Sequence, residues 1–472
     1  MKNTEKKVGI LWFRNDLRLH DNEALEDALN QVENLYPVYV LDDRWVNGKT
    51  SYGFAKTGLH RMRFIIESLI DLKNNLNSRG SDLYCYTGKT EDVIFDLVRQ
   101  TGANWVFCNR ERTQEESEIQ DALEKKLWTI GREMRFYRGK MLLYTADLPF
   151  PVTHTPDTFS QFRKEVEKFV LVRKPLDTPN KIYGGKELQS TTIPNLKDLG
   201  FSETSNYDCD SYQFKGGESE AISRLNYYLW ESDCIAHYKE TRNGLFGDDY
   251  SSKFSAYLSQ GCLSPKLVYS EVKKYEKERG GNQSTYWLIF ELLWRDYFRF
   301  IAKKYGNAIF QFSGINGHKQ IVRGGKEEFE AWCDGRTGIP FIDANMSELN
   351  ATGFMSNRGR QNVASFLIHD LKVNWLWGAE YMESLLVDYD PCSNYGNWNY
   401  LAGVGTDPRE GRYFKVLNQA KRYDPNGDYV RYWIPELAHL DSGDIHWPFA
   451  NPSLDDVPSI YKNPVVLTEV PI

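Results

Sequence analysis

The sequence predicts an N-terminal α/β domain, built on a doubly wound parallel sheet, and a C-terminal all-α domain. Over the first 140 residues, short β-rich runs alternate with amphipathic helical patterns, which is the order of a parallel sheet with crossover helices. From about residue 216 to 440, helical periodicity dominates. We therefore predict an α/β domain over 1–140 and a helical domain over 216–440, joined by a connector over 141–215.

Five β-rich runs account for the expected strands, and helical patterns such as 58–76 and 91–100 fill the gaps between them. Sheets of this kind often bind nucleotides, but no GxGxxG occurs, and the "NGKT" and "TGKT" fragments lack the first glycine of a P-loop. A nucleotide-dependent enzyme of the standard types is therefore disfavoured. The expected strands are 8–13, 35–41, 82–86, 105–108 and 134–137.

The two remaining segments have the composition of irregular chain. The connector is rich in Pro, Thr, Asp and Gly, as in "PFPVTHTPDT", and we expect it to be irregular. The last segment, 441–472, contains five prolines and is expected to form an extended strap on the surface.

The composition also limits location and partners. No run approaches the roughly 20 apolar residues of a membrane span, and the N-terminus lacks a signal-peptide core, so we expect a cytoplasmic protein. Seven cysteines without a CxxC pair predict reduced thiols and no metal site. The net charge of −7 argues against indiscriminate nucleic-acid binding. However, residues 409–431 interleave six Lys or Arg with aromatic residues, which suits either a solvated face or nucleic acid.

Three stretches of the helical half carry charges that need partners. The run 286–300 is apolar on nearly every face, yet it contains Glu291 and Arg295. These two residues either pair along the helix, or share a cavity face with Trp294, whose indole would be a stacking platform. The helix that opens at Ser356 carries Arg358 and Arg360 in its first turns, where cations oppose the macrodipole.

Internal carboxylates or an anionic ligand would stabilise those two arginines, and Asp388 and Asp390 are candidate carboxylates. The third stretch, "YSSKFS" at 250–255, places serines and a lysine where a helical pattern begins. It is either a set of helix caps or a diphosphate cradle. Together the three stretches suggest a helical cavity for a large, planar, phosphorylated cofactor.

Five motifs resemble those of the photolyase and cryptochrome family. They include "WFRNDLRLHDNEAL" (12–25), "FELLWRDYFRF" (290–300) and "DYDPCSNYGNW" (388–398), and the resemblance runs from about residue 8 to 437. "SNRGRQN", "YSSKFS" and "DLPFPVTHTPDTFSQFRK" are most similar to DASH-type cryptochromes. The resemblance implies that the helical domain holds FAD in a U-shape.

Matched positions carry the family's cofactor roles. Asn394 would face flavin N5, and because an amide has no proton to give at neutral pH, this favours repair over signalling. By similarity, the diphosphate would be held by Tyr238, Ser251, Ser252, Lys253 and Ser255, and the isoalloxazine by Asn357, Arg360, Asp388, Asp390 and Asn394, with Arg360 paired to Asp388.

The resemblance implies light-driven repair of cyclobutane pyrimidine dimers by electron transfer from excited reduced FAD, preferably in single-stranded DNA and by a monomer. Extruding a dimer costs a few kcal/mol of stacking and pairing, least in a single strand, and photolyases are among the enzymes that flip bases in this way. A blue-light sensor without repair activity is the alternative. The lesion-facing positions would be Glu291, Trp294, Asn357, Gln361 and Tyr400, with Arg242 and Arg358 toward phosphates.

One position departs from the family pattern. Trp398 and Trp375 match the two inner members of the family's three-tryptophan photoreduction relay, but the third member falls on Val322. Another aromatic residue, Trp332 or a tyrosine, must then carry the hole to the surface, or photoreduction is slow. Relatives also bind methenyltetrahydrofolate as an antenna, near a segment that matches 109–120; Glu115 is our candidate, although Glu is common at a helix start in any case.

Overall fold

The computed structural model describes residues 7–185, 187–202, 213–407 and 412–467. All five predicted strands are present, and they form one parallel sheet with the order β3-β2-β1-β4-β5. The strands are β1 (Val8–Phe13), β2 (Asn34–Asp42), β3 (Tyr84–Gly88), β4 (Trp105–Asn109) and β5 (Glu133–Tyr137).

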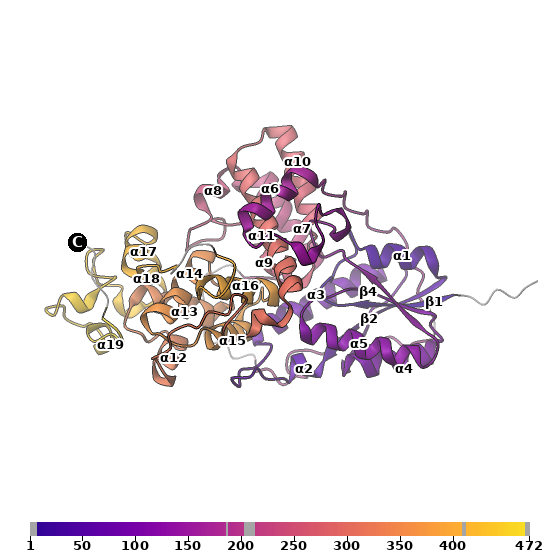
Figure 1. The fold of residues 1–472 in the computed structure, drawn as a ribbon, viewed down its shortest axis with the longest axis horizontal. Coiled ribbons are helices and arrows are strands. Elements are labelled where there is room, and N and C mark those ends of the chain that lie inside the picture. Colours follow the sequence, from indigo (N-terminus) through magenta and orange to yellow (C-terminus); the bar gives the residue numbers. More distant parts are fainter. Residues whose placement is uncertain (1–6, 186, 203–212, 408–411, 468–472) are drawn as a thin grey trace, which may run out of the picture.

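The alternating side chains of β1 show how the sheet is covered on both faces. Leu11 and Phe13 join a core with helices α1 (Glu23–Gln31) and α3 (Leu59–Asn77). Ile10 and Trp12 join the opposite core with α4 (Thr90–Thr101) and α5 (Gln114–Trp128). Figure 1 shows α1 and the α4–α5 pair on opposite sides of the strands. The doubly wound α/β domain is therefore confirmed.

The helical domain is built around α11 (Gln283–Tyr305), whose first residues are capped by Asn282. Figure 1 places α11 near the centre of the molecule, with α8 and α10 above it. It packs against α8 and α16. The other helices of this half are α7 (Glu218–Asn226), α8 (Tyr238–Thr241), α9 (Ser255–Gln260), α10 (Pro265–Arg279), α12 (Lys326–Cys333), α13 (Pro340–Thr352), α14 (Asn357–Ser365), α15 (Trp375–Leu385), α16 (Pro391–Leu401), α17 (Val416–Tyr423) and α18 (Asp428–Trp433).

The connector is more regular than its composition suggested. Residues Phe159–Phe169 form helix α6, capped by Thr158, with Phe159, Phe162 and Val166 buried. The expectation of an irregular segment is therefore wrong here. A Thr cap and apolar residues at helical spacing outweigh the Pro-rich and Asp-rich stretch that precedes them.

The C-terminal segment packs against the helical domain as far as the structure describes it. Val457 and Tyr461 are buried in the core of that domain, and the Val465 N–H donates to the Thr337 carbonyl at 2.8 Å. Turns, the 3-10 helix η8 (Pro448–Ala450) and the short helix α19 (Ser459–Lys462) make up much of the segment, so the expectation of an extended strap is wrong. Within the described ranges, no helix is long and apolar enough to cross a membrane.

Candidate functional site

A cavity of about 100 Å³ lies where α14, α15 and α16 meet, and it is lined by Asn357, Arg360, Gln361, Ala364, Met382, Leu386, Asp388, Tyr389, Asp390, Ser393, Asn394, Asn397, Trp398 and Leu401. All five positions predicted to line the isoalloxazine are in this set. We call it the ring cavity. Ligand pockets are typically ~300–1,000 Å³, so the ring cavity accounts for only part of a dinucleotide site.

The predicted ion pair between Arg360 and Asp388 forms the base of the ring cavity. Arg360 Nη2 lies 2.9 Å from Asp388 Oδ2, and Arg360 Nε donates to the Met355 carbonyl at 2.9 Å. This explains how one cation is tolerated near the start of α14. Asp388 Oδ1 is buried and has no hydrogen-bond partner among the described residues. A ligand donor in the cavity would satisfy it.

Asp390 also lines the ring cavity, and two contacts hold its carboxylate in place. It caps α16 by accepting from Ser393 N at 2.9 Å, and it forms a buried ion pair with Arg299 of α11. Although burial opposes ionisation, the guanidinium groups of Arg299 and Arg295 lower the pKa of Asp390 to about 2. The carboxylate therefore stays ionised at neutral pH.

Two residues of α16 turn toward the same cavity. The Asn394 amide group donates to the Ala379 carbonyl at 3.0 Å, which fixes its orientation. Trp398 is 2% exposed and lies against Gly378 of α15, where a Cβ would meet the indole ring at 2.4 Å. Only glycine allows this approach. Trp375 is fully buried at the start of α15 and donates to the Phe312 carbonyl at 3.0 Å.

The predicted diphosphate cradle lies next to the ring cavity. The Phe354 ring lies between them, 4.6 Å from the Lys253 ammonium and 5.3 Å from the Arg360 guanidinium. Lys253 is buried with a positive φ of 59°, and burial lowers its pKa to about 7. No carboxylate of the described chain lies within ion-pair distance of it. A buried ammonium in this state suits an anionic ligand.

The predicted cradle also contains three serines and Tyr238. Helix α9 begins at Ser255, and no side chain caps it, so the serines are not the caps that the alternative interpretation required. The Ser251 and Ser252 carbonyls accept hydrogen bonds from Arg224 at 3.2 and 3.1 Å. Tyr238 is buried. These residues and the two orphaned polar groups described above fit FAD.

Glu348 is a candidate that sequence reasoning missed. It is buried on α13, accepts a hydrogen bond from Tyr429 Oη at 2.7 Å, and faces the charges of Lys253 and Arg360. Burial raises its pKa to about 7. A lone glutamate within the apolar helix "PFIDANMSELNAT" was the only signal in the sequence.

Of the predicted lesion-facing residues, Asn357 and Gln361 line the ring cavity, whereas Glu291 and Trp294 lie on α11 and Tyr400 lies on α16. Glu291 pairs with Arg242, with Nη2 and Oε1 2.6 Å apart, and burial raises the pKa of Glu291. The helical pair between Glu291 and Arg295 is therefore wrong. Arg295 instead donates to the carbonyls of Lys140, at the end of the α/β domain, and of Leu258 in α9. Neither Glu291 nor Arg295 lines the ring cavity.

One face of the Trp294 ring is covered by a ring from the connector. Phe159 of α6 stacks on its ring with the centroids 3.7 Å apart and an interplanar angle of 12°, and Tyr400 meets it edge-on at 5.6 Å. Sequence reasoning missed Phe159, because the connector was expected to be irregular. The platform is thus a two-ring stack that is partly supplied by the connector.

Several cations gather beside these residues. Arg358 donates to Asn243 Oδ1 at 2.8 Å and lies 4.7 Å from the centre of the Tyr423 ring, so neither carboxylate considered for it is its partner. Burial lowers the pKa of Arg358, and the nearby charges of Arg242, Arg422 and Arg412 lower it further. A cluster of guanidinium groups attracts phosphates. Part of the basic run, 408–411, lies outside the described residues.

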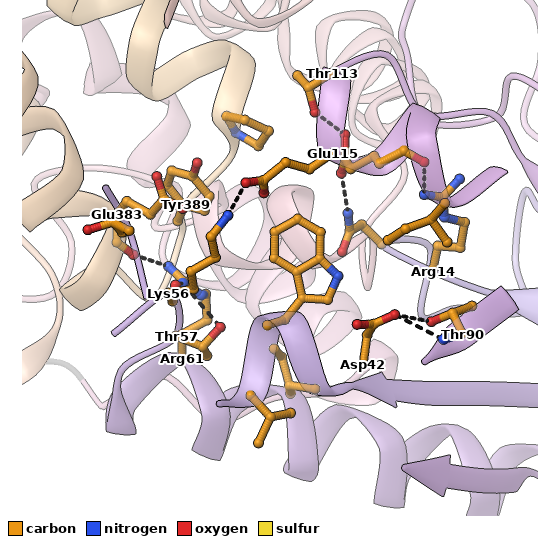
Figure 2. A pocket seen from close by; sticks show the side chains of 18 of the residues that line it. Arg14, Asp42, Lys56, Thr57, Arg61, Thr90, Thr113, Glu115, Glu383 and Tyr389 are labelled. Atoms are coloured by element: carbon orange, nitrogen blue, oxygen red, sulfur yellow. Dashed lines mark hydrogen bonds and ion pairs between the residues drawn. The ribbon is translucent and has the colours of Figure 1, made fainter. Parts of the chain in front are cut away.

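A second cavity, of about 440 Å³, opens between the two domains (Figure 2). We call it the interdomain cavity. It lies at the carboxyl ends of β1 and β2, where open α/β sheets bind ligands, and α15 and α16 close its other side. Glu115 lies on its rim and is ion-paired with Lys56. Figure 2 shows Arg14 and Asp42 on the sheet side and Glu383 and Tyr389 on the helical side.

Comparison with known proteins agrees with this architecture. The family model described as "DNA photolyase" matches residues 9–180, and the "FAD binding domain of DNA photolyase" matches residues 287–469. The cryptochrome DASH of Xenopus laevis is 47% identical over 447 residues, which are 94% of this chain and 86% of that protein.

Two solved structures are also similar. A cryptochrome from Synechocystis sp. superposes with a TM-score of 0.92 at 46% identity, covering 96% of this chain and 93% of the other. An archaeal photolyase from Sulfolobus tokodaii, solved with two FAD molecules, superposes with a TM-score of 0.78 at 28% identity, covering 98% and 96%. The chain therefore belongs to the photolyase and cryptochrome family, with an FAD-binding helical domain, and within that family it is of the DASH type.

Proposed function

We propose that this protein repairs cyclobutane pyrimidine dimers in DNA under blue light, with a preference for single strands. The observation that supports this most is the arrangement around the ring cavity. Asn357 and Gln361 line it, and Glu291 and Trp294 lie on α11, which packs directly on the helix that carries Asn394 and Trp398. A lesion held by these residues would lie beside the flavin.

Bound reduced FAD would supply the electron that splits the dimer when it is excited by light. The protein's own residues would bind the DNA and orient the lesion. The raised pKa of Glu291 suits a carboxyl group that hydrogen-bonds base edges, and the face of Trp294 opposite Phe159 offers stacking worth ~1–3 kcal/mol per base. Arg242, Arg358 and Arg412 provide a basic border for the phosphates. The amide group of Asn394 is not an acid at neutral pH, so it would not give up a proton there.

The preference for single strands follows from the free-energy cost of flipping the dimer out of a duplex. Flipping a dimer out of a duplex costs a few kcal/mol, and a single strand largely avoids this cost. A chain with a net charge of −7 and one local basic border has little long-range attraction for a duplex with which to offset the flipping cost. We therefore expect single strands to be the better substrate.

The interdomain cavity would hold a second chromophore that harvests light. Methenyltetrahydrofolate is expected from the family resemblance, and the second FAD in the Sulfolobus structure makes a flavin the other candidate. Trp12, Trp45 and Tyr52 line the cavity and suit a planar ring.

The test is to reduce the purified protein and add thymine-dimer oligonucleotides, single-stranded and duplex, in the dark and in blue light. Restored thymines should appear only in the light, and faster in single strands. A protein that binds FAD and restores none would be a light sensor, and the proposal would fail.

A further inference from the structure

The two inner tryptophans that the family resemblance implies are present on neighbouring helices, but the outer position is occupied by Val322. Trp398 lines the ring cavity, and Trp375 is buried on the neighbouring helix. Val322 is 43% exposed and has no ring to oxidise. When an electron is taken from Trp398, the resulting hole needs another oxidisable side chain near Trp375.

Tyr395 is placed to take that role. Its ring centroid lies 6.4 Å from that of Trp375, and it lines the interdomain cavity although it is only 6% exposed. Its hydroxyl donates to Glu383 Oε2 at 3.1 Å. Glu383, on α15, lines the same cavity. The phenol therefore combines a neighbouring indole, a carboxylate acceptor and an opening to the outside.

We propose that Tyr395 and Glu383 form the exit for the hole, in place of a tryptophan at position 322. Tyr395 gives one electron to the oxidised Trp375, which returns to the neutral indole, and the phenol proton moves to the Glu383 carboxylate. The products are a neutral Tyr395 radical and a protonated Glu383. In protein without the second chromophore, a small thiolate that enters the interdomain cavity then gives one electron to the Tyr395 radical and becomes a thiyl radical, and the proton moves back from Glu383 to the phenolate oxygen.

The carboxylate distinguishes this route from the other candidate, Trp332. Trp332 is fully buried; its ring neighbours are Phe329 and Tyr381, and its indole donates to the Val363 carbonyl. The Tyr381 hydroxyl donates to Asn350 Oδ1 and the Cys333 carbonyl, and amide oxygens do not accept a proton at neutral pH. Burial raises the pKa of Glu383, which strengthens it as a base.

The proposal rests on the flavin of the proposed function but not on DNA repair, so it is tested without DNA. The FAD-loaded, oxidised protein is illuminated in the presence of a thiol, and the rate of flavin reduction is measured for wild type, Tyr395→Phe, Glu383→Gln and Trp332→Phe. We expect the first two variants to slow reduction about tenfold or more, because a positioned proton acceptor typically contributes at least that much. Trp332→Phe should match wild type.

Two further measurements locate the radical and control for misfolding. In protein frozen under light, electron paramagnetic resonance should show a tyrosyl signal that narrows with ring-deuterated tyrosine and is absent from Tyr395→Phe. Adding Val322→Trp to Tyr395→Phe should restore the rate by a second exit, which a damaged protein would not allow. Undiminished reduction in Tyr395→Phe, or slowing in Trp332→Phe alone, would overturn the proposal. Failure of wild type to repair DNA would contradict only the proposed function.

Discussion

The two cavities of this molecule differ in how their charges are held. In the ring cavity, Arg360 is paired with Asp388 and Arg299 with Asp390, and all four belong to the helical domain. The interdomain cavity is more than four times larger and takes its lining from both domains, and the Glu115 of its rim ion pair is about half exposed. Buried, paired charges fix one orientation of one ligand. At the rim of the interdomain cavity the ion pair is weak, so shape and contact with the aromatic lining have a larger part in the choice of chromophore there.

The largest expected effect comes from breaking a charge pair in the ring cavity. Arg360→Ala leaves Asp388 buried without its partner, which typically costs ~3–5 kcal/mol. We expect protein purified from cells to lose its yellow colour and to unfold at lower urea concentration. Arg358→Ala, two residues away but outside the ring cavity, is the matched control and should keep FAD. Equal flavin content in both variants would contradict the assignment.

Glu348 provides a pH test of the same region. Its pKa is raised from 4.5 to about 7 in the folded protein, so its stabilising contribution is complete below about pH 4.5 and is lost as the pH rises through 7. The full loss should amount to about 3–4 kcal/mol, most of it between pH 5 and pH 8.

Glu348→Gln should remove this loss, so the variant should gain stability relative to wild type between pH 5 and pH 8. Urea unfolding at both pH values measures it. The comparison with wild type is needed because Lys253, whose pKa is lowered to about 7, acts in the opposite direction. An identical pH dependence in both proteins would place the ionisation elsewhere.

Substitution of a lesion-facing residue should lower repair without loss of flavin, unlike substitution in the ring cavity. Glu291→Ala removes a charge-assisted hydrogen bond worth ~1.5–3 kcal/mol, so light-driven repair of single strands should fall at least tenfold while flavin absorbance is retained. Repair yield and absorbance are measured on the same sample. Loss of FAD together with repair would show that Glu291 belongs to the cofactor site.

The smallest effect on stability is expected at the rim of the interdomain cavity. The pair between Glu115 and Lys56 is partly exposed, and such pairs contribute ~0–1 kcal/mol. Glu115→Gln should therefore leave the free energy of unfolding almost unchanged, yet weaken the binding of added methenyltetrahydrofolate, followed by fluorescence. FAD content serves as the control. Unchanged affinity would remove Glu115 from the chromophore site.

The sequence was informative where a site is built from contiguous stretches. The five strands follow from local runs, and the residues from Asn357 to Gln361 and from Asp388 to Trp398 reach the ring cavity because each set lies on one helix or its cap. The pair of Asp388 with Arg360 was predictable through the family resemblance.

Contacts between distant segments were not predictable. Arg242 is Glu291's partner from 49 positions earlier, and no periodicity connects them, so the nearer Arg295 was the wrong choice. Phe159 and Lys56 were missed for the same reason. Their roles depend on how the connector and the sheet domain pack against the helical domain, which local patterns do not encode.

The stacking of Phe159 on Trp294 has a practical consequence for dividing the protein. A fragment that begins at residue 216 would retain the helices around the ring cavity. It would, however, expose to water the apolar face of Trp294 that Phe159 covers. Such a fragment should aggregate more readily, and the indole ring of Trp294 should be more mobile. Any attempt to move the FAD-binding domain into another protein should therefore include α6.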